Sequence, residues 1–285
     1  MPNWKAKTRN QVTTIRFDPM AAGDIVWVML RSDAHHDSPR CKRKLEREHL
    51  DIALARDAVI LDAGDTFDAM QGRFDPRRNM EDVREEDRCA NYYDSIVTHA
   101  AEDYMPYAKL WAMFGKGNHE DSVVKHANTD LISNLVYRLN VEGGGNIAVG
   151  AYAGYVRLMF TLNKTRKSSF KIRYHHGSGG AAPVTRGTIQ TNRQMVFLPD
   201  ADIIWNGHNH QSYTLPIKRE RLTNSGRIKY DICWHVRTPG YKAEYEDGDS
   251  YGTKLNSGPT PLGCAWLKFT ADGYGMNLEV LSSIT

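Results

Sequence analysis

The segment AVILDAGDTFD, residues 58–68, joins a short apolar run to the pattern G-D-x-x-D. The run from Ala58 to Leu61 is apolar at every position, which is typical of a buried strand. Asp65 and Asp68 follow this strand closely. Because ligands in α/β folds bind in the crevice at the carboxyl ends of strands, the segment predicts a site at the edge of a sheet.

Four further polar clusters also follow apolar runs that we expect to be strands, at residues 25–30, 110–114, 170–174 and 203–205. These clusters are DAHH at 33–36, GNHE at 117–120, HHG at 175–177 and GHNH at 207–210. They hold seven of the eleven histidines. Five strand ends would therefore deliver carboxylate, imidazole and amide groups to one edge, and these groups are typical metal ligands.

The ordered series D-x-H, G-D-x-x-D, G-N-H-[DE], a His beside a Gly, and G-H-x-H resembles the signature of the calcineurin-like metallophosphoesterase superfamily. One short pattern recurs by chance, but the full set spans Asp33 to His210, most of the chain. The resemblance implies an α/β fold, a four-layer α/β/β/α sandwich. It also implies a metal-dependent phosphoesterase that hydrolyses a phosphomono- or phosphodiester, and it identifies no substrate.

The resemblance further implies two divalent metal ions. Asp65 would bridge both ions, since a carboxylate has two anionic oxygens. The implied ligands are Asp33, His35, Asp65, Asn118, His176, His208 and His210. A mixed nitrogen and oxygen set fits Mn, Fe, Zn, Co or Ni, and we take manganese as the first choice among them.

The implied chemistry is attack on phosphorus by a hydroxide that bridges the two metals, which lower its pKa. His119 is the candidate general acid, because it follows the ligand Asn118 and would reach the leaving oxygen. Asp68 would hold the His119 imidazole in the required tautomer, as in related phosphatases. Glu120 would have a secondary orienting role.

The two histidine doublets leave a choice. The D-x-H spacing selects His35 and leaves His36 as a supporting or substrate-facing group. His175 and His176 alternate across the strand, so only one of them faces the metals. In the family the ligand often stands directly before a glycine, which favours His176, and His175 remains the alternative.

Local patterns predict the remaining elements. Ser38 as N-cap and Pro39 at the first position predict a helix over 38–56. We expect a helical insertion at about 71–106, beside the mouth of the site, and a further helix over 129–140. Alternation predicts a hairpin from 147–162 and 168–174, and an all-β C-terminal part at about 211–285. The motifs draw on both halves of the chain, so we expect residues 1–285 to form a single domain.

Composition limits the partners and the compartment. The net charge of +3 argues against a broad surface that coats nucleic acid, although a local basic groove stays open. The four cysteines form no C-x-x-C pair, which fits reduced thiols. We find no signal peptide and no membrane-length apolar stretch, so we expect a cytoplasmic protein that does not bind membranes.

Several rival functions stay open. Ala69 and Met70 follow Asp68 where the protein Ser/Thr phosphatase branch carries Arg-Gly, so dephosphorylation of proteins is not expected. A nuclease of the Mre11/SbcD kind, acting on DNA, is the first alternative, and a non-catalytic binding module on the same fold is the second. The retained His119 speaks against the second, because a scaffold needs no general acid.

The expected partner is a phosphoester substrate, either a small molecule or a nucleotide. Nucleic acid stays open as a partner because basic residues gather at and beyond the expected hairpin tip, including Lys167, Lys171 and Arg173. We prefer to interpret these residues as a solvated tip.

Overall fold

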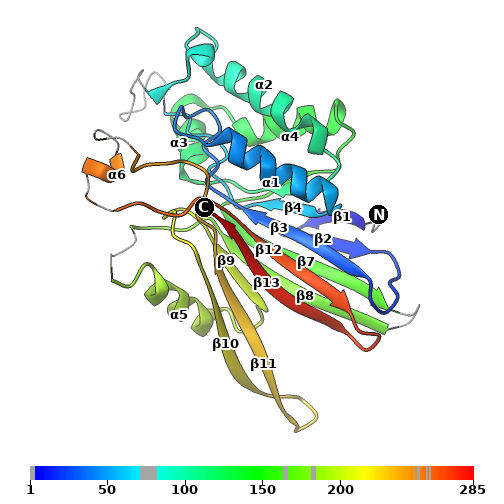
Figure 1. Cartoon of the computed structure of the whole chain (residues 1–285). Helices are drawn as coiled ribbons and strands as arrows, with labels where there is room; N and C mark the ends of the chain where they lie inside the picture. The colour runs from blue at the N-terminus through cyan, green and yellow to red at the C-terminus, as the bar shows by residue number, and fades with distance from the viewer. Residues whose placement is uncertain are drawn as a thin grey trace.

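The chain forms two β-sheets that pack face to face, with helices on the outer faces (Figure 1). The computed structural model describes residues 4–70, 82–162, 166–180, 184–246, 248, 251–254, 256 and 258–285. Within these residues the predicted four-layer α/β/β/α sandwich is confirmed.

The six-stranded sheet runs in the order β13-β12-β3-β4-β5-β6. Its strands are β3 (Ile25–Arg31), β4 (Val59–Asp62), β5 (Trp111–Phe114), β6 (Ala148–Val149), β12 (Gly263–Ala271) and β13 (Met276–Ile284). Neighbours from β3 to β6 are parallel, whereas β12 runs antiparallel to both β3 and β13. The strands β3, β4 and β5, which precede three of the motifs, therefore end at the same edge.

The seven-stranded sheet runs in the order β1-β2-β7-β8-β9-β11-β10. Its strands are β1 (Trp4–Arg9), β2 (Val12–Phe17), β7 (Ala153–Leu162), β8 (Arg166–His175), β9 (Ile203–Asn206), β10 (Tyr213–Leu222) and β11 (Ile228–Arg237). Strands β8 and β9 are parallel, and His175 lies opposite Asn206. The two motifs that follow these strands therefore also begin side by side.

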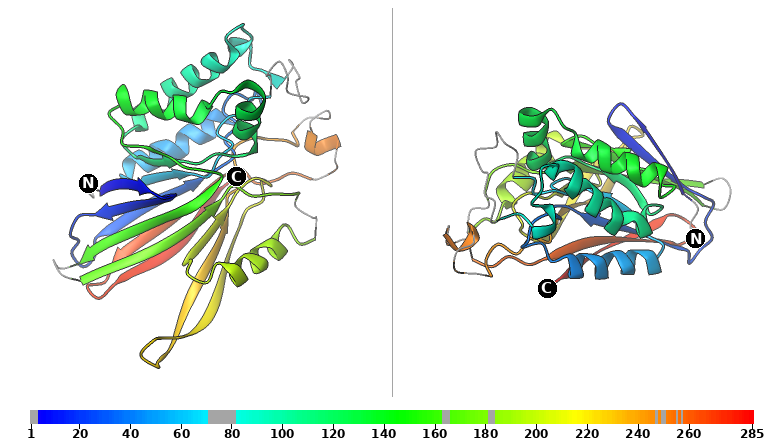
Figure 2. Two further views of the ribbon diagram at one scale, coloured as in Figure 1. Left: turned by 180° about the vertical axis from the view of Figure 1, so that it is seen from behind. Right: turned by 90° about the horizontal axis from the view of Figure 1, so that it is seen from above.

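Helices cover the two sheets unequally (Figures 1 and 2). The outer face of the six-stranded sheet packs against α1 (Arg43–Ala55), α2 (Tyr92–Tyr104) and α4 (Leu131–Val141). The seven-stranded sheet packs against α5 (Thr188–Phe197) alone among the described helices. The remaining helical segments are α3 (Asn118–Ala127), α6 (Tyr251–Lys254), and the 3₁₀ turns η2 (Glu85–Asp87) and η3 (Met105–Tyr107).

Two large apolar clusters hold the layers together. One lies between the sheets, where Leu30 and Leu61 of one sheet meet Val156 and Trp205 of the other. The second lies between the six-stranded sheet and its helices and is centred on Trp111. Alternation along the strands sends successive side chains to opposite faces, so β3, β4, β5 and β12 each supply both clusters.

The predicted helix over 38–56 was wrong at its start. Helix α1 begins at Arg43, because tertiary contacts hold the preceding residues in another conformation. Lys42 N donates to Tyr241 O, and Ala243 N donates to Arg40 O. This pairing with a distant segment outweighs the local N-cap signal at Ser38.

Other element predictions differ in detail. Within the expected insertion, the helix covers Tyr92–Tyr104, and residues 71–81 lie outside the described part of the chain. Strand β1 and helices α3 and α5 were not expected. Among the described residues from 211 onward there are four strands and the short helix α6.

A buried ion cluster at the end of β3 should contribute strongly to stability. The side chain of Arg31 is fully buried, with Nε 2.7 Å from Asp62 Oδ2 and Nη1 2.5 Å from Glu46 Oε1. In Arg31→Met two buried carboxylates would lose their counter-charge, so we expect a loss of about 3–5 kcal/mol in the free energy of unfolding. Urea denaturation measures this loss.

The control for that experiment is Arg47→Met, because the Arg47 side chain is 60% exposed in its pair with Asp103. Exposed pairs contribute about 0–1 kcal/mol, so this variant should unfold almost like the wild type. Similar losses in the two variants would contradict the role of Arg31.

Candidate metal centre

Loops from both sheets meet at the proposed metal centre. Asp33 and His35 follow β3, Asp65 follows β4, and Asn118 follows β5 as the first residue of α3. The remaining predicted ligands come from the other sheet, with His176 after β8 and His208 and His210 after β9. The five strand ends were expected at one edge, and the structure brings them together from two sheets.

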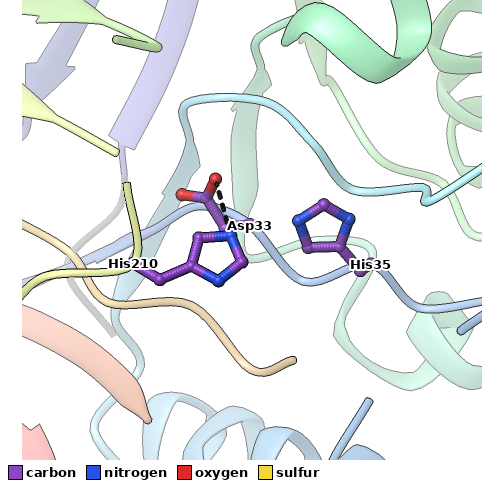
Figure 3. A group of neighbouring side chains, drawn as sticks. All are labelled: Asp33, His35 and His210. Carbon is purple, nitrogen blue, oxygen red and sulfur yellow. Dashed lines mark ion pairs between the residues drawn. The ribbon is translucent and has the colours of Figure 1, made fainter. Parts of the chain in front are cut away.

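The predicted ligands fall into overlapping clusters whose ligand atoms lie within 4.8 Å of one another. Asp33, His35 and His210 form one cluster, which Figure 3 shows with the Asp33–His210 ion pair dashed. Asp65, His176 and His208 form a second. A third joins His35 and Asp65 to His119. Asp65 belongs to the second and third clusters, and the third cluster connects it to the first through His35. The bridging role of Asp65 stays a prediction.

Backbone hydrogen bonds tie these loops directly to one another. Asp33 N donates to Gly64 O at 2.9 Å, and Gly207 N donates to His176 O at 2.8 Å. Across the two sheets, His208 N donates to both Asp33 carboxylate oxygens at 3.0 and 2.9 Å. The loops are thus held against one another by main-chain groups as well as by the charged side chains.

Five predicted ligands have a left-handed backbone. The φ angles are 53° at Asp33, 47° at His35, 53° at Asp65, 76° at His208 and 52° at His210. Non-glycine residues rarely adopt this conformation, and Asp and His are among those that tolerate it best. Such strain collects at functional sites, where the surrounding structure holds it.

Two motif glycines are required by the close approach of these loops. A Cβ at Gly117 would overlap the Asp65 carboxylate, and a Cβ at Gly207 would overlap that of Asp33. The glycines of G-N-H-E and G-H-N-H therefore let the main chain pass directly beside the two central carboxylates.

The donor set fits metal ions. His35 Nε2 and His210 Nδ1 are buried, and neither has a hydrogen-bond partner among the described residues. Buried polar atoms are normally satisfied, so unpaired imidazole nitrogens beside carboxylates suit a cation. Imidazole and carboxylate together are ligands for borderline divalent metals.

Opposite charges at the centre of the cluster shift the pKa values of Asp65 and His176. Burial alone would raise the pKa of Asp65, but His176 and His119 outweigh it and hold this pKa well below its usual range. Burial opposes the charge on His176, but Asp65 raises the pKa of this imidazole to about 10. Their atoms Oδ2 and Nε2 are 3.0 Å apart. Because metal ligation requires neutral histidine, metal binding here would release a proton.

The Glu120 carboxylate connects the loop after β4 to the loop after β5 by hydrogen bonds. Its carboxylate accepts hydrogen bonds from Gly117 N, Asp65 N and Phe67 N at 2.8, 3.0 and 3.0 Å. Burial and the charge of Asp65 raise the pKa of Glu120 to about 8. Glu120 therefore positions the G-D-x-x-D loop, and its secondary orienting role in catalysis stays a prediction.

His119 lies beside the cluster, but the expected contact with Asp68 takes a different form. The ring Nδ1 is 2.5 Å from the main-chain carbonyl oxygen of Asp68 and 3.6 Å from its carboxylate. The carbonyl, which can only accept, selects the tautomer with hydrogen on Nδ1. The Asp68 carboxylate instead lies 2.9 Å from His35 Nδ1 and 2.8 Å from Lys242 Nζ.

The sequence motifs did not identify two further side chains near the predicted ligands, those of Lys242 and Glu244. Lys242 is buried, and the charges of Asp68 and Glu244 raise its pKa although burial lowers it. Glu244 Oε2 is 3.8 Å from His210 Nδ1. Both residues come from the loop after β11, which carries no recognisable pattern, so only the tertiary contacts identify them. Asp37 was also missed, and it accepts from Asp68 N and Ala69 N.

The two histidine doublets are distinguished by their contacts. His176 is fully buried and points to Asp65, and its Nδ1 lies 3.0 Å from Ala63 O. His175 is half-buried, and its Nδ1 accepts from Gly177 N at 2.9 Å. His36 points away from the clusters and lies 2.9 Å from Asp103 Oδ2.

Comparison with known proteins gives remote likenesses. No protein-family model matches the chain, and no curated protein matches it. Vacuolar protein sorting 29 from Cryptosporidium parvum is 13% identical over 93% of this chain and 100% of its own, with a TM-score of 0.38. A predicted phosphoesterase from Streptococcus pneumoniae TIGR4 is 11% identical over 92% and 100%, with a TM-score of 0.32. Vps29 complexed with Zn²⁺ from Entamoeba histolytica is 11% identical over 90% and 99%, with a TM-score of 0.35.

Likenesses of this strength do not establish an activity. The resemblance of the ordered motifs to the calcineurin-like metallophosphoesterase superfamily, outside the protein Ser/Thr phosphatase branch, therefore stays a prediction. Among the described residues, no helix has the length and apolarity needed to cross a membrane. The function has to be inferred from the site itself.

The geometry predicts different effects for the two members of the second doublet. His176→Ala should lower the metal content of the purified protein, because its Nε2 lies within the cluster of Asp65 and His208. His175→Ala should retain the metal, because its Nδ1 is engaged with the main chain. Elemental analysis at one fixed pH measures both, and the reverse ranking would assign the ligand role to His175.

Proposed function

We propose that this chain is a dinuclear metal-dependent phosphoric ester hydrolase. The observation that carries this proposal is the set of overlapping ligand clusters, which Asp65 and His35 connect and in which His35 Nε2 and His210 Nδ1 are buried without hydrogen-bond partners among the described residues. The substrate would be a phosphomono- or phosphodiester, either a small molecule or a nucleotide. We also propose that the chain acts as one domain, since strands from both halves share the cluster between the sheets.

One metal position would use Asp33, His35 and His210, and the other would use Asn118, His176 and His208. Asp65 would serve both. When bound, two divalent ions supply a nucleophile at neutral pH and a clamp for the phosphate oxygens. Two carboxylates neutralise only part of the charge of two such ions, so the centre would remain attractive to a phosphate. The donor types suit Mn, Fe, Zn, Co or Ni.

His119 is the proposed general acid. Its Nδ1 is held by the Asp68 carbonyl, which leaves Nε2 to carry or release a proton. The side chain is 13% exposed, so it reaches the surface of the site. Lys242 holds the Asp68 side chain from the far side, and we propose that it fixes the loop on which this carbonyl lies.

A second candidate function is a non-catalytic module that binds metal. One observation favours it, because His119 shares a cluster with His35 and Asp65, and its Nε2 lies 3.9 Å from Asp65 Oδ2. A His119 that ligates a metal could not also protonate a leaving group. Metal content and turnover of a His119 variant separate the two candidates.

Replacing the shared carboxylate should disable the centre. Asp65→Asn should lose at least one metal and nearly all hydrolysis, because a neutral amide cannot bridge two cations. Elemental analysis and assay of a phosphoester panel measure the two effects. Asp94→Asn, an exposed position on α2, is the charge-matched control and should resemble the wild type. Two tightly held metals and full turnover in Asp65→Asn would refute the ligand scheme.

Replacing His119 should affect turnover selectively. His119→Ala should keep both metals and lose about 10²–10⁴-fold in turnover, the usual contribution of a general acid. The loss should be greater for an alkyl ester than for a nitrophenyl ester, whose leaving group departs as an anion without a proton. His126→Ala on the same helix is the control. Equal losses on the two esters with metals intact would exclude acid catalysis, and loss of metal would favour the non-catalytic candidate.

A further inference from the structure

The outer face of β1, β2, β7 and β8 is an open basic surface. Its members alternate with buried side chains along each strand, such as Ile15, Val156 and Ile172, which enter the cluster between the sheets. We call the outward-facing set the basic face, and it carries Lys5, Lys7, Arg9, Arg16, Arg157, Lys167, Lys171 and Arg173.

Strand register arranges these cations in rows across the sheet. The middle row runs from Lys7 past Thr14 to Arg157 and Lys171. The rows on either side place Lys5 beside Arg16, and Arg9 in line with Tyr155 and Arg173. Neighbouring strands lie about 4.8 Å apart and successive rows about 6.6–6.8 Å apart, so the charges form a regular lattice.

The strands of the basic face carry no acidic residue themselves, and the neighbouring Asp202, just before β9, interacts electrostatically with Lys171. The four strands contain no Asp or Glu, whereas the whole chain has 37 basic and 34 acidic residues. Within the described part of the chain, none of the ion pairs involves a residue of the basic face. A small net charge of +3 therefore conceals a strongly positive local field.

No described helix covers the basic face. Helix α5 packs over Ile204 and Cys233, which belong to β9 and β11, and leaves the other half of the sheet bare. Figure 2, in its left view, shows β2, β7 and β8 with no helix in front of them. The sequence alone could not predict the basic face. Lys5 and Lys171 are distant in the chain, and only the β2–β7 pairing brings their strands into one continuous sheet.

We propose that the basic face binds the phosphate backbone of nucleic acid, without sequence preference. Charge complementarity identifies a polyanion, since neutralised phosphates release counterions. The face lacks the exposed large apolar side chains that anchor a protein in a lipid surface, as no residue of these strands is among the exposed large hydrophobics. Tyr155, with the Arg173 guanidinium 5.2 Å from its ring, offers an aromatic surface for a base.

The basic face borders the metal centre. Strand β8 ends at His175, next to the predicted ligand His176, and β7 begins directly after Tyr152. The Tyr152 ring lies 5.3 Å from that of His176 and lines a cavity of about 330 Å³ with Gln11 from the β1–β2 turn. A bound strand would thus lie beside the centre, but the binding proposal does not require that the centre hydrolyse it.

The test removes three charges from the middle row. Lys7→Gln, Arg157→Gln and Lys171→Gln are combined in the full chain, and binding of a labelled oligothymidylate of about 20 nucleotides, longer than the usual single-strand site, is followed by fluorescence anisotropy against salt. Wild type should bind with a steep salt dependence. Each lost phosphate contact lowers the slope of log K against log salt by about 0.7, so the triple variant should lose about 2.

The matched control removes the same charge elsewhere. Lys44→Gln, Lys109→Gln and Lys229→Gln are exposed positions outside the basic face, and together they should leave affinity and slope close to wild type. Equal weakening by both triple variants would refute the proposal, because net charge alone would then explain binding. Failure of the wild type to bind the oligonucleotide would also refute it.

Two further measurements identify the partner and separate this proposal from the hydrolase proposal. Tight binding to phosphatidylserine vesicles, lost in the middle-row variant while oligonucleotide binding is unchanged, would overturn the assignment in favour of a membrane. The oligonucleotide is recovered and examined for cleavage. Binding without cleavage supports the basic face and leaves the phosphoesterase assay to judge the metal centre independently.

Discussion

The contact between Asp65 and His176 is the one on which the site depends. It joins a loop of the six-stranded sheet to a loop of the seven-stranded sheet, with a separation of 3.0 Å between Oδ2 and Nε2. The apolar cluster between the sheets fixes how closely the two loops can approach. Four of the predicted ligands follow strands of one sheet and three follow strands of the other, so the packing of the sheets brings the predicted ligands together.

Bringing so many buried carboxylates together is costly unless each is paired. Main-chain N–H donors and two buried cationic side chains pair with these carboxylates and offset this cost. Glu120 and Asp37 accept hydrogen bonds from the loop after β4, and Arg31 and Lys242 provide positive charge at its two ends. These braces leave His35 Nε2 and His210 Nδ1 without a hydrogen-bond partner among the described residues, which suits a centre prepared for cations.

Helices cover the outer faces of the two sheets unequally. Three helices cover the six-stranded sheet with a large apolar cluster, whereas α5 covers only the β9 and β11 side of its partner. An uncovered sheet face needs polar side chains, and here the outward-facing positions of four strands include many Lys and Arg side chains and no Asp or Glu. The proposed metal centre lies at one end of this face, so with metals bound a phosphate-rich ligand would meet positive charge at the centre as well as on the face.

The sequence by itself determined the layered fold and the main candidates for the site. Short apolar runs followed by Asp33, Asp65 and His208 are local signals, since strand ends and left-handed turns need few distant contacts. Helix starts were less predictable, because the pairing of Lys42 with Tyr241 outweighs the N-cap signal at Ser38. Only the tertiary structure decided which carbonyl holds His119, that Lys242 supports Asp68, and that β1 joins β8 in one basic face. These features depend on residues far apart in the chain, and their proximity arises from sheet pairing and packing that no local pattern encodes.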